Sequence, residues 1–102
     1  MAEMLKENAQ RLLSKVPEEK IFWCQDGRVF TDMKELAEAL TTMTDEFFSY
    51  HSNVEKKDFI NWVRDVIGDE KLAKDLEQAT SRTQAAEQVS SRVDVLNRQL
   101  SK

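Results

Sequence analysis

Glycine and proline, the residues that most often interrupt regular structure, are nearly absent from this chain. Gly27, Gly68 and Pro17 are the only ones among 102 residues. Such a sequence favours long helices joined by short connections. We therefore predict a mainly α fold, a compact bundle of five to six helices that forms a single domain over residues 1–102.

The two ends of the chain are predicted to be helices with matching apolar stripes. A helix over about 2–16 would end at Pro17, and a second would run over about 82–100. The stripes, with apolar residues three or four apart, are Leu5, Ala9, Leu12 and Val16 in the first, and Ala86, Val89, Val93, Leu96 and Leu100 in the second. We expect the two helices to pack together, with a homodimer through these terminal helices as the alternative.

One short β-hairpin is predicted near residues 21–30, in the sequence KIFWCQDGRVFTD. Asp26-Gly27 separates two short aromatic and apolar runs, and both residues tolerate the positive φ of a tight turn. We expect strands near 21–25 and 28–30. Alternation places Ile21, Trp23 and Val29 on one face, and Phe22, Cys24 and Phe30 on the other. The free strand edges are a place where a partner could add a strand.

The helical core is predicted over about 32–79. Asp32 with Glu35 resembles a capping box, Thr44 caps a short helix, and a helix over 54–67 ends at Gly68 before Asp69 opens the next. The expected core consists of Phe22 or Trp23, Val29, Leu36, Leu40, Phe47, Phe59, Trp62, Val63, Val66, Leu72 and Leu76, extended by Leu12, Val93 and Leu96.

The stretch YHSNVEKKDFINWVRD contains the candidate binding residues. They are His51, Asn53, Asp58, Trp62, Arg64 and Asp65. In one interpretation, His51 in the joint before the 54–67 helix lines a polar pocket with Asn53 and Asp58, at a helix start that suits an anion. In the other, Asn53 only caps the helix, His51 bonds a backbone carbonyl, and the aromatic residues form core. Arg64 is too far along the helix to pair with Asp58.

Catalytic and metal-binding patterns are missing from the sequence. His51 and Cys24, the single residues of their types, show no context of an activated pair. Glycine-rich phosphate loops and nucleophile elbows are absent as well. We therefore expect no enzyme, no cofactor and no metal.

Charge disfavours nucleic acid as a partner. Residues 32–81 contain 12 acidic and six basic residues, and an acidic middle repels phosphate. Only the last helix, with Arg82, Arg92, Arg98 and Lys102, is basic. The lone Cys24, the lack of an apolar run of membrane-spanning length and an N-terminus unlike a signal peptide predict a cytoplasmic protein without a membrane segment.

The order FWCQDGRVFTDMKELAEAL, then YHSNVEKKDFINWVRDVIGDEKLA, resembles a family of small archaeal and bacterial proteins described as a domain of unknown function. That family has an aromatic hairpin, a Y-H-x-N box and a D-F-x-x-W-[VI]-x-D-V-x-G-D helix. The resemblance covers Ile21 to about Ala79 and implies one compact domain, but no reaction.

Together these observations predict a non-enzymatic protein-interaction or adaptor module whose partner is another protein. Its surface would be the His51–Asp65 region, the hairpin edge, or both. The alternatives are a small-ligand or anion sensor with a pocket at the start of the 54–67 helix, and weak nucleic-acid binding through the C-terminal helix.

Overall fold

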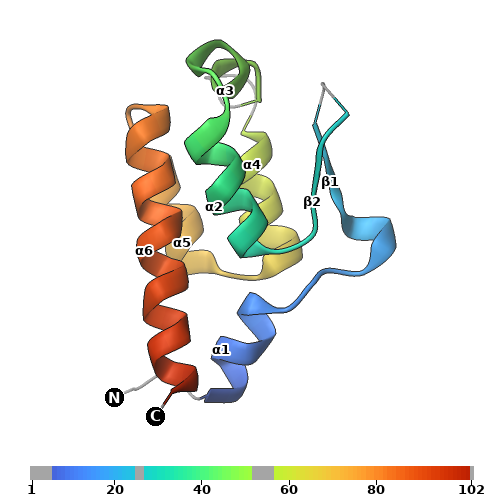
Figure 1. The fold of residues 1–102 in the computed structure, drawn as a ribbon, viewed down its shortest axis with the longest axis vertical. Helices are drawn as coiled ribbons and strands as arrows, with labels where there is room; N and C mark the ends of the chain where they lie inside the picture. Colours follow the sequence, from blue (N-terminus) through green and yellow to red (C-terminus); the bar gives the residue numbers. More distant parts are fainter. Residues whose placement is uncertain (1–5, 25–26, 52–56, 102) are drawn as a thin grey trace.

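Among the residues that the structure describes, the elements are helical apart from one hairpin, as predicted (Figure 1). The structure, a computed structural model, describes residues 6–24, 27–51 and 57–101. In chain order, its elements are α1 (Lys6–Leu13), the 3₁₀ turn η1 (Glu18–Lys20), β1 (Phe22–Trp23), β2 (Val29–Phe30), α2 (Met33–Thr42), α3 (Asp45–His51), α4 (Asp58–Trp62), the π-helical turn η2 (Val63–Ile67), α5 (Glu70–Glu77) and α6 (Arg82–Leu100). The radius of gyration is 13.2 Å, close to the value of about 13 Å expected for a compact chain of this length.

Helix α6 contacts helices from both halves of the chain. It contacts α2 most extensively, and also α1 and α5. Figure 1 shows α2 beside one half of α6 and α1 beside the other half. Val89 and Leu96 of its predicted stripe are buried, and Val93 is partly buried against the core. The predicted packing of the two terminal helices is therefore confirmed, and the stripe is used within the monomer.

The predicted hairpin is also confirmed, with strands shorter than expected. β1 and β2 are antiparallel, with Phe22 opposite Phe30 and Trp23 opposite Val29. The turn closes through a hydrogen bond from the Gly27 amide to the Cys24 carbonyl (3.0 Å). Gly27 has φ +94°, a conformation that glycine adopts without strain.

Only one face of the hairpin belongs to the core. Phe22, Cys24 and Phe30 are buried, whereas Trp23 and Val29 are exposed. The expectation of Val29 as a core residue is therefore wrong, and of the alternatives Phe22 and Trp23 it is Phe22 that is buried. The reason is the alternation of side chains along a strand: Val29 shares the face of Trp23, and the helices cover only the opposite face.

The buried face of the hairpin supplies the aromatic centre of the core. Phe22 stacks on Phe30 with ring centroids 5.0 Å apart and on Phe59 at 5.3 Å, and Trp62 meets Phe22 edge-on at 5.9 Å. The predicted core positions Leu12, Leu36, Leu40, Phe59, Trp62, Val63, Leu72, Leu76 and Leu96 are buried, while Phe47, Val66 and Val93 are partly buried.

Helix α1 ends at Leu13, three residues before the predicted end. Pro17 disfavours a helical conformation at the residue before it. The extended segment that follows α1 instead pairs with the end of the hairpin, because the Val16 amide donates to the Thr31 carbonyl (2.7 Å). The predicted start near residue 2 lies outside the described residues.

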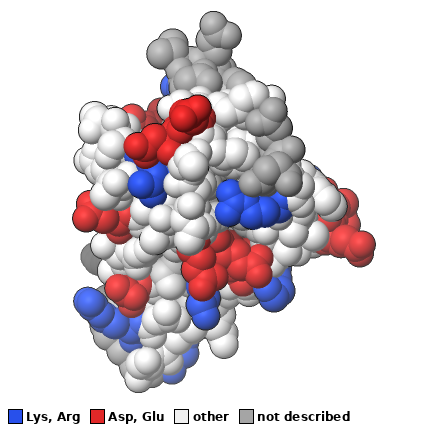
Figure 2. All heavy atoms as spheres, turned by 45° about the horizontal axis from the view of Figure 1, so that its top comes forward, with Lys and Arg blue, Asp and Glu red and all other residues white. Residues whose placement is uncertain are grey.

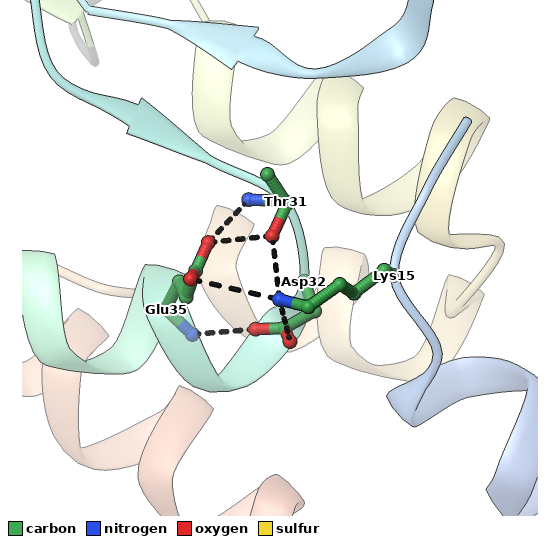
Figure 3. Close-up of polar contacts among 4 residues, drawn as sticks. All are labelled: Lys15, Thr31, Asp32 and Glu35. Carbon is green, nitrogen blue, oxygen red and sulfur yellow. Dashed lines mark hydrogen bonds and ion pairs between the residues drawn. The ribbon is translucent and has the colours of Figure 1, made fainter. Parts of the chain in front are cut away.

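The cap of α2 fastens this segment to the hairpin (Figure 3). Asp32 Oδ1 accepts from the Glu35 amide (2.8 Å), as predicted. Glu35 Oε1 accepts from the amide and the hydroxyl of Thr31, both at 2.7 Å. Lys15 Nζ lies 3.3 Å from Asp32 Oδ2 and 3.7 Å from Glu35 Oε2. Hydrogen bonding by the Thr31 hydroxyl is the main reason why the pKa of Glu35 lies below its ordinary value.

The helix predicted over 54–67 is described from Asp58 onward. It begins as α4 and continues as the π-helical turn η2, which the Gly68 amide closes on the Val63 carbonyl (2.8 Å). Gly68 has φ +89° and ends this helix as predicted. The side chain of Asp69 then caps α5 by accepting from the Leu72 amide (3.1 Å). Residues 52–56 lie outside the described part.

Among the helices described, none combines the length and the apolar character that crossing a bilayer requires.

Candidate functional site

His51 and Asp58 are the two candidate residues that the structure brings together. His51 is the last residue of α3, not part of a joint as expected, and Asp58 is the first residue of α4. Their Nδ1 and Oδ2 atoms are 2.9 Å apart. The predicted proximity of these two residues is therefore confirmed, and one partner of His51 is a carboxylate.

Aromatic rings enclose the imidazole of this pair. His51 is 5% exposed. Its ring centroid lies 5.6 Å from that of Phe22, 5.1 Å from Phe47, 5.0 Å from Tyr50 and 5.5 Å from Phe59. The Asp58 side chain is partly exposed, so the pair spans the boundary between core and solvent. A buried polar ring needs such a partner, because leaving it without a hydrogen bond would be costly.

Trp62 has a separate position in the core. Its indole Nε1 donates to the Lys20 carbonyl (2.9 Å), and its ring lies edge-on to Phe22 and Phe30. Trp62 thus joins α4 to the turn that precedes β1. This contact accounts for a buried tryptophan without a ligand, because the N–H of a buried indole needs an acceptor.

Arg64 and Asp65 lie on the exposed side of the helix and bond to their own neighbours. Arg64 Nε donates to Asp65 Oδ1 (3.0 Å), and Arg64 Nη2 donates to Asn61 Oδ1 (2.9 Å). The hydrogen bond to Asp65 raises the pKa of Arg64. The last of the six candidates, Asn53, lies outside the described residues.

The hollows identified on the described surface are lined by other residues than His51 and Asp58, which were expected to line a pocket. One, of about 400 Å³, lies between α5 and α6 and includes Lys71, Gln88 and Val95. Another, also of about 400 Å³, lies around the start of α6. Within the described ranges, no group of three or more His, Cys, Asp or Glu side chains is arranged to hold a metal ion.

Two arginines of the basic C-terminal helix bond to residues that are far away in the sequence. Arg92 donates to both carboxylate oxygens of Asp69, at 2.7 and 3.2 Å. Arg82 donates to Asp45 Oδ1 (2.8 Å) and to the Leu40 carbonyl (2.8 Å) at the end of α2. The position of Asp69 as a helix cap was predictable, but nothing in the sequence indicates a partner 23 residues away.

The outward side of the hairpin exposes two large apolar side chains to solvent. Trp23 is 70% exposed, and Val29, directly opposite, is 38% exposed. Trp23 is not among the six candidates taken from the sequence. The alternation of the strand could have indicated it, since a tryptophan opposite a buried face must point to solvent or to a partner.

No protein-family model, curated protein or solved structure matches this chain. The resemblance to a family of unknown function therefore stays a prediction.

Proposed function

We propose that this chain is a non-enzymatic protein-interaction module that binds its partner through the outward side of the hairpin. This surface, called the hairpin face, consists of Ile21, Trp23 and Val29. The observation that carries the proposal is the 70% exposure of Trp23. Tryptophan is the residue type most enriched among those that dominate binding energies at protein interfaces.

The hairpin holds Trp23 in place before any partner arrives. Its neighbours Phe22 and Cys24 are buried, so the backbone on both sides of Trp23 is anchored in the core. Binding then orders little beyond one side chain, which keeps the entropic cost of association small. Covering the 70% of Trp23 that is exposed would contribute about 3–4 kcal/mol, if the whole side chain presents about 200 Å² and each Å² is worth about 25 cal/mol.

The two alternative functions have less support. An anion pocket at the start of α4 would need access to His51, whose ring is enclosed by aromatic side chains. Nucleic-acid binding through α6 would need Arg82 and Arg92, which already bond to Asp45 and Asp69. On the face shown in Figure 2, acidic and basic side chains are interspersed rather than gathered by sign.

The experiment that tests the proposal is capture of partners by a tagged chain from a lysate of its own source. The test variant is Trp23→Thr, which keeps a residue suited to a strand. The control is Val95→Thr, because Val95 on α6 is 39% exposed and belongs to another surface. The fluorescence of the buried Trp62 reports whether each variant remains folded.

A partner captured by the wild type and by Val95→Thr, but lost with Trp23→Thr, supports the hairpin face. Equal capture by all three chains removes the hairpin face as the binding surface. Failure of the wild type to retain any protein above a tag-only control overturns the proposal of an interaction module.

A further inference from the structure

We propose that the outer edge of β1 binds an extended segment of the partner by strand addition, so that the hairpin becomes a three-stranded sheet. This inference rests on the proposed function and specifies how the hairpin face would recognise its partner. Trp23 would then contribute both its side chain and its backbone.

The hydrogen-bond pattern of the hairpin directs the backbone of Trp23 outward. The Cys24 amide donates to the Arg28 carbonyl (2.8 Å), so these two residues form a hydrogen-bonded pair across the hairpin. Such pairs alternate along an antiparallel ladder, which makes Trp23 and Val29 a non-hydrogen-bonded pair. The N–H and C=O groups of Trp23 therefore point away from β2, toward the side where a third strand would lie.

The two edges of the hairpin differ in how the rest of the chain covers them. On the β2 side, the Thr31 carbonyl accepts from the Val16 amide, and α2 packs against this strand. Figure 1 shows β1 as the outer strand, with β2 between it and α2. An exposed row of backbone donors and acceptors is a template for an additional strand. The β1 edge is thus the accessible one.

The size of the apolar surface favours an extended segment over a second folded copy of this chain. A stable interface between folded proteins buries about 1,200–2,000 Å² in total. One tryptophan supplies only about 150–250 Å², and the opposite Val29, a smaller side chain that is 38% exposed, adds little to it. An extended segment needs less apolar area, because main-chain hydrogen bonds to the strand edge supply much of its affinity.

The charge at the base of β1 indicates which segment fits. Glu18 and Glu19 are exposed in the turn before the strand, and with the exposed Lys20 they leave this turn with a net negative charge. A lysine or arginine near one end of the incoming segment would complement them. The proposed ligand is therefore an extended segment that alternates β-branched residues with polar ones and carries a basic end.

The test is a titration of the ¹⁵N-labelled full chain with the synthetic peptide KTVTVTVK, followed by NMR. Two further peptides have the same side chains and are N-methylated at alternate residues, one along each edge, so that neither can donate hydrogen bonds from its methylated edge. A fourth, ETVTVTVE, reverses the charge of the ends. Peptide concentrations up to about 5 mM would occupy about five sixths of a site with a dissociation constant of about 1 mM.

Strand addition predicts that KTVTVTVK shifts the Trp23 backbone amide and, at about 5 mM, slows its hydrogen exchange about five- to sixfold, because about one chain in six stays free. The Trp62 indole signal should stay in place. At least one N-methylated form should fail to bind. At low salt, ETVTVTVE should bind more weakly than KTVTVTVK, and this difference in affinity should disappear at high salt.

Two variants separate the edge from the side chain. Trp23→Val removes the ring but keeps the outward N–H, whereas Trp23→Pro removes both without breaking a ladder bond to β2. Residual amide protection in Trp23→Val and none of the peptide-induced changes in Trp23→Pro support strand addition. Thermal unfolding of both variants verifies that the hairpin is retained.

The inference is overturned if KTVTVTVK at about 5 mM leaves the Trp23 amide unchanged, or if every N-methylated peptide binds as well as the parent. If capture of the natural partner still depends on Trp23 in that case, the hairpin face is correct and only the mode of binding is wrong. If capture is independent of Trp23, the proposed function itself fails.

Discussion

Replacing Arg92 by methionine should destabilise this protein more than removing an exposed charged side chain would. The Arg92 side chain is 12% exposed and the Asp69 side chain 2%, and two hydrogen bonds join them. Arg92→Met leaves the Asp69 carboxylate buried with only its cap bond to the Leu72 amide. Breaking a buried pair in this way costs about 3–5 kcal/mol.

That loss is a large part of the total free energy of unfolding, which is about 5–15 kcal/mol for a chain of this size. Asp69→Asn should cost about 1–3 kcal/mol, because asparagine still caps a helix while the Arg92 charge loses its partner. The double variant buries neither charge, so it should be more stable than Arg92→Met alone by about 1–2 kcal/mol.

Equilibrium unfolding in urea, followed by circular dichroism, measures these differences, provided that the slope against urea stays constant. The control is Lys71→Met, which removes the exposed Lys71–Asp75 pair and should cost no more than about 0.5 kcal/mol. A loss below about 1 kcal/mol for Arg92→Met would refute the reasoning, because that is the value of a surface pair. A double variant as unstable as the sum of the two single ones would refute it as well.

Three further predictions concern caps and turns. The Thr31 hydroxyl is the main cause that lowers the pKa of Glu35 in the folded state, so the stabilisation from Glu35 is present above its ordinary pKa of 4.5 and is lost as pH falls through the lower folded value. Urea unfolding from about pH 6 to about pH 3 should therefore show the free energies of unfolding of the wild type and Glu35→Gln converging at low pH. Gly68→Ala and Gly27→Ala should each cost about 1–2 kcal/mol in the same assay, because both positions have positive φ; a neutral effect at both would contradict the backbone argument. Arg82→Met removes bonds to α2 and α3 and should lower the melting temperature measured by circular dichroism by several degrees, about 4–8 °C per kcal/mol lost. An unchanged melting temperature would show that these bonds do not contribute to stability.

Local features of the fold were accessible from sequence because each depends on a few neighbouring residues. Gly27 and Gly68 marked the hairpin turn and a helix end, and both have positive φ in the structure. Asp32, Thr44 and Asp69 were identified as helix caps, and each accepts a hydrogen bond from the backbone three residues later. A cap acts within one turn of helix, so its signal lies entirely in the local sequence.

The candidate site was predictable only in part, for the same reason. The proximity of His51 and Asp58 followed from seven residues of separation, whereas the enclosure of His51 by Phe22 and Phe59 required the hairpin to pack on α4. Arg92 looked like a surface cation in the sequence. Its pairing with Asp69 depends on how α5 lies against α6, which no local pattern specifies.

The sequence by itself determined the helices, the caps, the hairpin and the two faces of its strands, because side-chain periodicity and turn chemistry are local properties. Only the tertiary structure decided which face of the hairpin the helices cover. That choice buried Phe22 and left Trp23 exposed, and it followed from the position of α4, whose Phe59 and Trp62 pack against Phe22. Alternation alone makes two faces but does not say which one meets the core, since that depends on contacts between residues far apart in the chain.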